Sequence, residues 1–306
     1  MRPAATMSAQ RPAAPTVRIN LMAMLRRRSV PLTIAMFVCV AYFLLPLVWL
    51  AVASTKSDSG LFNTFGYSVQ TRDFQLWHNI RQVFSYGDGQ FVRWLVNTVF
   101  YAIASAGGAA ALATAGGYGF AKFDFVGKRA AFAVVVVSIM VPGIALTIPS
   151  YLLFAKVGIV NTPLSIILPS LVSPFGIYLM RVYAADAIDD SLLEAARIDG
   201  AGEVRIFFQI ALRLLSPGVV TVVLFTLVAT WNNYFLPFIM LNDPNLFPVT
   251  VGLAQWNAQA SGGGGAEAVF SLVITGSLIS VLPLAVAFLL LQRYWQSGLS
   301  AGSVKT

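Results

Sequence analysis

The sequence EAARIDGAGE, residues 194–203, is a polar segment between two apolar blocks that are each long enough to cross a membrane. Together with residues 186–190 it carries half of the chain's twelve acidic side chains. Ser191 precedes Glu194 by three residues, which is the spacing of a capping box and predicts a helix that begins at Ser191. Gly200 predicts the end of this helix, because glycine commonly terminates helices in a left-handed conformation.

A second short helix is expected from about residue 203 to residue 212. Its apolar side chains recur at helical spacing and are predicted to share one face: Val204, Phe207, Phe208 and Ala211. Ala195 and Ala196 leave the centre of the first helix without bulk, so another backbone or the wall of a cleft can approach it closely. The predicted shape is a plug made of helix, glycine bend and helix. The alternative interpretation is an amphipathic helix pair that lies on the bilayer surface and joins two spans.

The spacing within this segment resembles the EAA loop of the membrane-spanning subunits of bacterial ATP-binding-cassette (ABC) importers. One position departs from the family pattern, because Arg213 stands where a proline is common, and Pro217 follows it. The resemblance implies that the loop docks into a cytoplasmic ATPase and that Glu194 meets cationic and backbone donors there. The ATPase-coupling residues that it implies are Glu194, Ala195, Ala196, Asp199, Gly200, Ile210 and Leu212.

Composition places the chain among membrane proteins. Of 306 residues, 58% are hydrophobic and 10% are charged, and the mean hydropathy is +0.76, values that exclude a soluble catalytic domain. The single cysteine, Cys39, excludes an internal disulfide and a cysteine metal cluster, and a single histidine, His78, argues against zinc chemistry. We therefore expect an all-α polytopic protein with no metal or cofactor of its own. The net charge of +8 suggests a nucleic acid or a membrane surface as a partner.

The distribution of basic residues decides in favour of the membrane. Roughly twenty apolar residues are needed for a crossing, and six blocks reach that length, at about 31–54, 94–119, 130–154, 163–183, 218–241 and 268–291. With the N-terminus inside, fifteen of the twenty Lys and Arg residues fall in cytoplasmic segments, as the positive-inside rule requires. Both termini and the coupling loop at 184–217 are therefore predicted to be cytoplasmic. The expected organisation is a disordered basic tail (1–30), a six-span domain (31–292) and a C-terminal tail (293–306).

The outer loops and the spans contain few groups that carry chemistry. Residues 55–93 are expected to hold a short interfacial helix, and Gly262 to Gly265 form a flexible tether without the Gly-Lys-Ser or Gly-Lys-Thr of a phosphate-binding loop. No Asp, Glu, Lys or Arg lies deep in a span, which argues against a proton or ion relay. A stripe of small residues on the second span predicts close helix packing: Gly107, Ala111, Ala115 and Gly119. Four prolines are expected to break or kink the third and fourth spans: Pro142, Pro149, Pro169 and Pro174.

The most polar segment within the predicted spans is Trp231-Asn232-Asn233-Tyr234. Its amides either join helices or line a translocation path, where they and the aromatic faces would suit the hydroxyls and C–H faces of a sugar. The segment resembles the fifth-helix region of carbohydrate importer permeases, and residues 292–305 are similar to the tail of the smaller maltose-type permease. The resemblance to this family covers about residues 31–305.

The resemblance implies a type I ABC importer fold and a permease of the carbohydrate (maltose-like, first) class in the bacterial inner membrane. It implies three protein partners: a second permease, a dimeric ATPase that binds ATP and Mg²⁺, and an extracytoplasmic solute-binding protein. No nucleic acid is expected. A permease for another solute, such as glycerol phosphate, a polyamine or a peptide, is an alternative. A six-span membrane enzyme is a more distant one, since no cluster of catalytic or metal-binding side chains is apparent.

Overall fold

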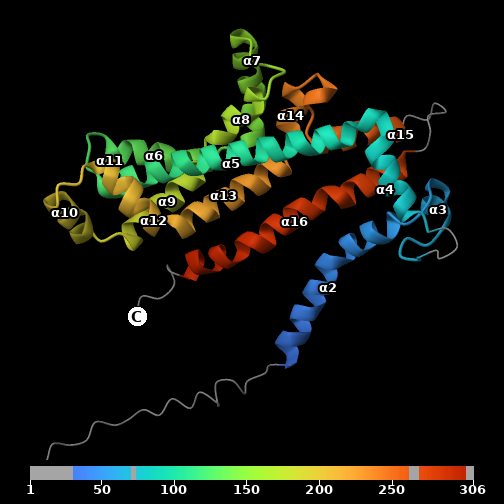
Figure 1. Cartoon of the computed structure of the whole chain (residues 1–306), viewed down its shortest axis with the longest axis horizontal. Helices are drawn as coiled ribbons and strands as arrows, with labels where there is room; N and C mark the ends of the chain where they lie inside the picture. Colours follow the sequence, from blue (N-terminus) through green and yellow to red (C-terminus); the bar gives the residue numbers. More distant parts are fainter. Residues whose placement is uncertain (1–29, 70–73, 262–268, 301–306) are drawn as a thin grey trace, which may run out of the picture. The chain divides into compact units, whose positions relative to one another are not determined.

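The computed structural model describes residues 30–69, 74–261 and 269–300 (Figure 1). The chain divides into two compact units, residues 1–48 and residues 49–306. The described part of the first unit belongs to helix α2 (Val30–Ala53), which contains Pro46 and matches the first expected span. The basic tail expected at residues 1–30 lies almost wholly outside the described residues.

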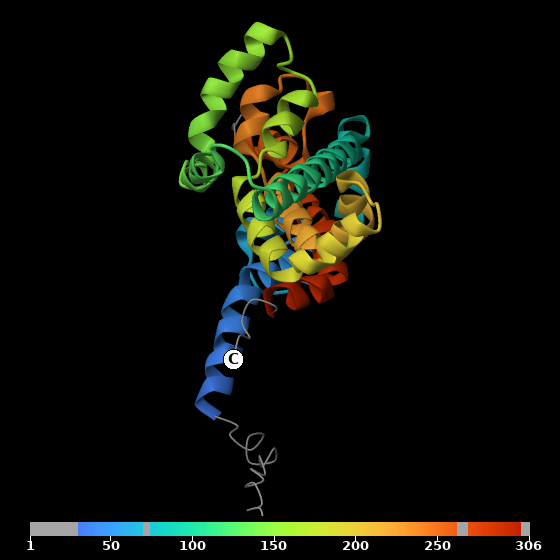
Figure 2. The same cartoon turned by 90° about the vertical axis from the view of Figure 1, so that its left-hand side faces the viewer.

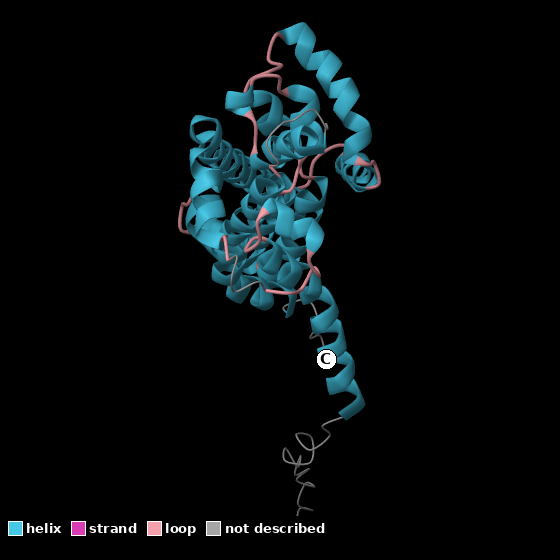
Figure 3. Ribbon diagram, turned by 90° about the vertical axis from the view of Figure 1, so that its right-hand side faces the viewer, coloured by secondary structure: helices cyan, strands magenta, loops and turns pink. Residues whose placement is uncertain are grey.

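The second unit is built of helices and loops, and no strand occurs in the described part of the chain (Figure 3). In chain order its helices are α3 (Asp58–Asn63), α4 (Leu76–Ser85), η2 (Tyr86–Gly89), α5 (Gln90–Lys122), α6 (Lys128–Ile139), η3 (Gly143–Leu146), α7 (Thr147–Val157), α8 (Leu164–Leu171), α9 (Pro174–Ala187), α10 (Asp190–Ile198), α11 (Glu203–Ile206), η4 (Phe207–Ala211), α12 (Leu212–Leu214), α13 (Ser216–Trp231), α14 (Phe235–Met240), η5 (Pro244–Leu246), α15 (Val249–Ser261) and α16 (Phe270–Ser300).

The helices agree with the expected number of spans. Four helical segments are long and apolar enough to cross a membrane: α2, the segment 76–122 that contains α5, α8 with α9, and α16. Two further pairs qualify as bent spans, α6 with η3 and α7, bent by 102°, and residues 203–214 with α13, bent by 76°. Within the described residues the count is therefore four, or six when each bent pair is one span. The outer loop at 55–93, where one short helix was expected, contains two, α3 and α4.

Helix α5 is the centre of the second unit, where it packs against α8, α9 and α13 (Figure 2). Its buried residues include a row of small ones, Ala106, Ala110, Ala113 and Gly117. A Cβ atom on Gly117 would lie 2.5 Å from the Cβ of Met180 and 2.7 Å from the backbone nitrogen of Arg181. Only glycine therefore allows the backbones of α5 and α9 to approach this closely.

The small-residue stripe predicted on α5 does not pack against this chain. Gly107, Ala111 and Ala115 are exposed, and a Cβ atom on Gly107 or Gly119 would meet nothing within 4 Å. Small residues occur on more than one face of α5, and spacing alone does not tell which face contacts the neighbouring helices. The buried stripe is the adjacent one that ends at Gly117.

Three of the four expected prolines lie at or near helix breaks. Pro142 stands between α6 and η3, Pro169 lies just before the end of α8, and Pro174 is the first residue of α9. The hydroxyl oxygen of Ser173 accepts the Gly176 N–H at 3.1 Å and caps α9. Pro149 was expected to break a helix and does not, because it lies in the first turn of α7, where its missing N–H has no intrahelical partner to lose.

Candidate functional site

The predicted plug lies at one end of the long helices, and α4 with α15 lies at the other end (Figure 1). Its first helix, α10, begins at Asp190 with Asp189 as the N-cap residue, so the predicted start and capping box at Ser191 are wrong. Asp189 has the extended conformation of an N-cap (φ −72°, ψ 137°). Ile188 and Leu193 on either side are both buried in one apolar cluster. Tertiary packing therefore sets the start of the helix ahead of the local capping signal.

The predicted end of this helix at Gly200 is confirmed. Gly200 has φ +81°, and the N–H of Ala201 donates to the Ala196 carbonyl at 2.9 Å while the N–H of Gly200 donates to the Arg197 carbonyl at 3.0 Å. These two bonds form a Schellman motif, which requires a left-handed residue at the position of Gly200. Ala196 is buried, and Ala201 packs against the same cluster. The glycine bend thus turns the chain back onto the core.

The second predicted helix contains a wider turn than the sequence indicates. It consists of α11, the π-helical segment η4 and α12. Ile206, Ala211 and Leu215 are fully buried, at spacings of five and then four residues. A π-turn inserts one extra residue and rotates the face that follows it. The four residues predicted to share one face are therefore separated: Val204 and Phe208 are 73% and 60% exposed, whereas Ala211, after the π-turn, is buried.

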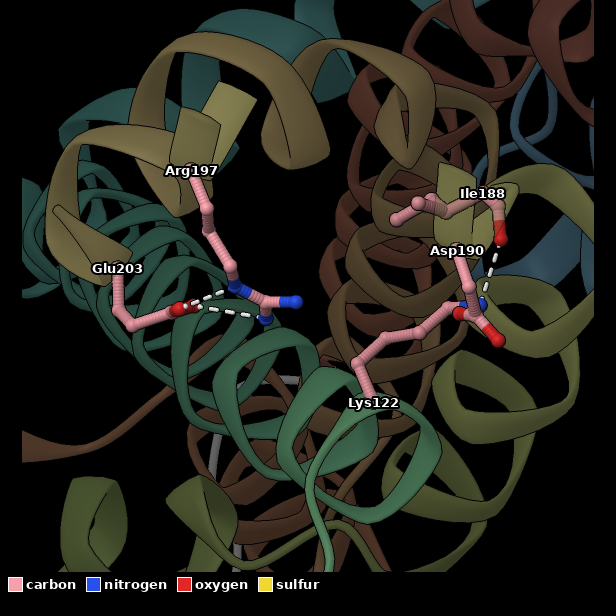
Figure 4. A network of polar contacts seen from close by, with 5 residues as sticks. All are labelled: Lys122, Ile188, Asp190, Arg197 and Glu203. Atoms are coloured by element: carbon pink, nitrogen blue, oxygen red, sulfur yellow. Dashed lines mark hydrogen bonds and ion pairs between the residues drawn. The ribbon is translucent and has the colours of Figure 1, made fainter. Parts of the chain in front are cut away.

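Two ion pairs involve the plug, one that joins it to α5 and one within it (Figure 4). The ammonium of Lys122, at the end of α5, contacts the carboxylate of Asp190 at 2.7 Å and donates to the Ile188 carbonyl at 2.5 Å. Arg197 pairs with Glu203 at 2.7 Å, across the bend at Gly200. Hydrogen bonding to these cations lowers the pKa of the Asp190 and Glu203 carboxyl groups, and the Glu203 carboxylate raises the pKa of Arg197.

The predicted coupling residues fall into two groups. Glu194, Ala195, Asp199 and Gly200 are exposed. The other three turn partly or wholly toward the chain's own core, with Ala196 buried and Ile210 and Leu212 half-buried. No structural finding tests their assignment to an ATPase, which stays a prediction.

The sequence interpretation missed the exposed apolar side chains of the plug. Ile198 is 86% exposed, and together with Val204 and Phe208 it adds apolar surface to a segment that is otherwise polar. The signal available in the sequence was an isoleucine and a valine that flank Gly200 within a charged stretch.

The four residues predicted for a translocation path separate in the structure. Trp231 is buried, and its indole N–H donates to the Ser280 carbonyl at 3.2 Å, a contact between α13 and α16. The side-chain amide of Asn232 donates to the Val228 carbonyl of its own helix at 2.9 Å. Tyr234 stacks on Phe238, with ring centroids 5.3 Å apart. Among these four, Asn233 is the one that lines the two cavities described below.

Asn233 lies at the break between α13 and α14. Its side-chain oxygen accepts the Leu236 N–H at 3.3 Å and its carbonyl accepts the Thr250 hydroxyl at 2.8 Å. The cavity that it lines has a volume of about 680 Å³ and is also lined by Thr147, Ser150 and Ser170. A smaller cavity of about 330 Å³ shares Ser170 and Asn233 with it. The sequence interpretation missed these hydroxyl residues, although Thr147 and Ser170 lie next to the breaks that the prolines indicate.

At the opposite end from the plug, α5 holds the loop that precedes α15 through side chains. The indole N–H of Trp94 donates to the Pro244 carbonyl at 2.9 Å, and the Tyr101 hydroxyl donates to the Leu246 carbonyl at 2.8 Å. The Asn97 amide donates to the Asn245 and Phe247 carbonyls at 2.8 and 3.0 Å. These four hydrogen bonds fix the loop to α5.

Comparison with known proteins defines the class. Residues 107–296 match the family described as the binding-protein-dependent transport system inner membrane component, and the chain belongs to this family. It is therefore a multi-pass membrane protein of a transport family.

Individual relatives come from sugar transport systems. The chain is 30% identical to the arabinooligosaccharides transport system permease protein AraQ of Halalkalibacterium halodurans, over 71% of this chain and 75% of that protein. It is 29% identical to the lactose transport system permease protein LacG of Rhizobium radiobacter, over 93% of this chain and 100% of that protein.

A solved structure shares the fold. A chain of a bacterial ABC transporter involved in the import of the acidic polysaccharide alginate superposes with a TM-score of 0.74 at 20% identity, over 93% of this chain and 100% of that chain. The expected all-α, type I ABC importer fold is thereby confirmed.

Proposed function

We propose that this chain is the permease subunit of an ABC importer for a sugar or short oligosaccharide, in which it forms half of the transmembrane path. The observation that carries the proposal is the exposed plug around Gly200, in a chain whose relatives bear the names of sugar permeases. The cavity beside Asn233 supports a sugar, because the residues that line it carry hydroxyl, amide and apolar groups and no charge. An anionic solute such as glycerol phosphate would find no cation there.

In this proposal the plug couples the path to ATP hydrolysis in a partner. Glu194, Ala195, Asp199 and the bend at Gly200 enter a cleft in the dimeric ATPase, which binds ATP and Mg²⁺. The exposed apolar residues Ile198, Val204 and Phe208 complete the contact surface. The plug is attached to the core through three buried or half-buried residues: Ala196, Ile210 and Leu212. ATPase closure moves the plug, and the broken spans rock between inward-open and outward-open states.

The remaining partners follow from the orientation. Fifteen of the twenty basic residues fall in segments that would face the cytoplasm if both termini do, which places the plug in the compartment that contains ATP. The fixed loop at residues 244–249 then faces the binding protein outside, and a second permease completes the path. A reporter that is active only outside the cell is expected to be silent when fused after Thr306 and active within Gly262 to Gly265. The reverse pattern would contradict this orientation.

Reversal of charge at Glu194 tests the coupling. Glu194→Lys is expected to leave the chain inserted in the membrane while it abolishes sugar uptake and releases the ATPase from the purified complex. The matched control is Asp124→Lys, which reverses an exposed acidic side chain outside the plug and is expected to transport normally. Co-purification and uptake of radiolabelled lactose or raffinose measure the two effects. Normal uptake with bound ATPase in Glu194→Lys would contradict the proposal.

A further inference from the structure

Helices α6 and α9 pack against each other near the plug, and each carries a stripe of side chains that begins with an arginine (Figure 1). On α6, Arg129, Phe132 and Val136 are spaced by three and then four residues, so they share one face. On α9, Arg181 and Tyr178 are spaced by three. The rings of Phe132 and Tyr178 stack, with centroids 6.2 Å apart and an interplanar angle of 20°. The two stripes therefore lie side by side.

The arginine at the plug end of each stripe has no acidic partner. The guanidinium of Arg181 lies 4.0 Å from the centroid of the Phe132 ring, which is a cation–π contact. Arg129 lies about one helical turn from Phe132, so the two cations belong to one surface. Neither arginine forms an ion pair with a residue that the structure describes, whereas Lys122 and Lys128 each pair with an aspartate. Two cations are therefore available to an anion from outside the chain.

The position of Arg181 along its helix sets its depth in the membrane. It lies six residues before Ala187, the last residue of α9, which is about 9 Å at 1.5 Å per residue. Residues 164–187 form one of the segments that are long and apolar enough to cross a membrane. A cation this close to the end of a span reaches the headgroup region with its long side chain. Phospholipid phosphates lie at that depth.

Apolar and aromatic side chains continue both stripes toward the middle of the spans. Val136 on α6 and Phe175 and Tyr178 on α9 are exposed in this chain. The surface thus changes from cationic near the plug to apolar farther along the helices. An anionic phospholipid has the same order of groups along its length, with the phosphate first and the acyl chains after it.

We propose that the paired stripes of α6 and α9 bind an anionic phospholipid of the leaflet on the plug side, with its phosphate at Arg129 and Arg181 and its acyl chains along the apolar part. Basic pockets between membrane helices bind anionic headgroups in this way. The planar guanidinium matches the oxygens of a phosphate, and the Phe132 ring fixes one face of Arg181. The inference goes beyond the proposed function and needs only that the spans lie in a bilayer, as membership of the family implies.

Lipid binding by the whole complex tests the site. The chain is purified with its second permease and ATPase in a mild detergent, and native mass spectrometry measures the affinity for palmitoyl-oleoyl phosphatidylglycerol and for phosphatidylcholine with the same chains. Arg129→Gln and Arg181→Gln each remove one cation, and Arg181→Lys keeps the charge but removes the planar group. Arg213→Gln is the matched control, because Arg213 is an exposed arginine on α12, outside the stripes.

The unsubstituted complex is expected to bind phosphatidylglycerol at least about tenfold more tightly than phosphatidylcholine, because two cations act on the phosphate. Arg129→Gln and Arg181→Gln are each expected to weaken phosphatidylglycerol binding about fivefold, the factor for one cation near a membrane surface. A smaller loss is expected in Arg181→Lys, and a loss of about twofold at most in Arg213→Gln. Equal affinity of the unsubstituted complex for both lipids, or equal losses in Arg181→Gln and Arg213→Gln, would overturn the site.

Photocrosslinking identifies what covers the stripes and does not require the arginine variants to fold. Tyr178→p-benzoylphenylalanine keeps an aromatic ring within the site, and Val286→p-benzoylphenylalanine places the same group on the exposed surface of α16. In vesicles with equal amounts of both lipids, position 178 is expected to crosslink phosphatidylglycerol at least about threefold more than phosphatidylcholine, and position 286 to crosslink both equally. Crosslinks from position 178 to the second permease in place of lipid, or to both lipids equally, would overturn the site.

Discussion

The plug and the cavity of about 680 Å³ beside Asn233 are both polar regions of an apolar protein, yet they are polar in different ways. The plug carries full charges, in exposed ion pairs such as Arg197 with Glu203. The cavity holds only hydroxyls and an amide, such as Thr147 and Asn233. A charge costs several kcal/mol at membrane depth but little at a hydrated end. Polar groups within the membrane are therefore less costly when they are neutral, and polar groups in water can be charged.

The two regions also differ in how the chain builds them. The plug closes locally, because the bonds around Gly200 join residues five or fewer positions apart. The cavity needs segments from Gly143 to Leu236 to come together. Helix α9 connects the regions, since Pro174 at its start lines the cavity and Ala187 at its end leads into the plug. At 14 residues it is about 21 Å long, so a movement of the plug can reach the cavity through one rigid element.

The largest expected effect comes from breaking the local closure of the plug. Gly200→Val places a β-branched side chain at φ +81°, which costs about 1–3 kcal/mol and reorients the exposed face. We expect loss of uptake and of bound ATPase, while the chain stays inserted in the membrane. Gly202→Val is the control, because Gly202 has φ −73° and open space around a Cβ atom. Equal uptake in both variants would show that the left-handed bend is not needed.

A second prediction concerns the packing of α5 against α9, the helix that connects the plug and the cavity. Gly117→Ala places a methyl group 2.5 Å from the Cβ of Met180 and forces α5 and α9 apart. Such overpacking typically costs about 1–3 kcal/mol, and we expect a lower thermal midpoint of the complex with reduced uptake. Gly119→Ala meets nothing within 4 Å and is expected to be neutral or to stabilise the helix by up to about 1 kcal/mol. A thermal midpoint in Gly117→Ala that matches the one in Gly119→Ala would contradict the close approach of α5 and α9.

The smallest expected effect concerns pH. Arg197 lowers the pKa of the Glu203 carboxyl below its ordinary value of 4.5, so their pair contributes stability that is present above pH 4.5 and is lost as the pH falls through the depressed pKa. Hydrogen-exchange protection of the Ala201 amide, corrected for the intrinsic rate, is expected to be constant from pH 8 to 5 and to fall only below that. Glu203→Gln is expected to show the weaker protection already at neutral pH. A loss of protection between pH 8 and 6 would contradict this prediction, because the stability of the bend would then depend on a titratable group other than the Glu203 carboxyl.

Local signals in the sequence were sufficient to predict the bend at Gly200, but not to predict which faces of the plug helices are buried. Gly200 predicted the left-handed terminus correctly, because that conformation depends on one residue and its neighbours. The start at Ser191 and the face that contains Val204 and Phe208 were wrong. Both depended on packing, since burial of Ile188 and Leu193 sets the start and the π-turn in η4 sets the face.

For the translocation path, the sequence indicated a polar segment, residues 231–234, but not which of its residues line a cavity. The four residues 231–234 were the most polar within the spans, and of these Asn233 lines the cavity of about 680 Å³. Adjacent residues at a helix end point in different directions, so their sequence order does not tell which one reaches a solute. Thr147 and Ser150 were not predicted, because a hydroxyl in a span is common and becomes informative only when its neighbours are known.

The sequence by itself determined the class of protein, the number of apolar spans and the position of the helix-terminating glycine, since hydropathy, length and backbone freedom are properties of local stretches. The tertiary structure decided which stripe of α5 is buried, which face the plug exposes and that three separate breaks form one cavity. These features depend on contacts between residues far apart in the chain, and a helix with small or polar residues on several faces is compatible with more than one packing. Only the close approach at Gly117, the burial around Ile188 and the convergence at Asn233 select among them.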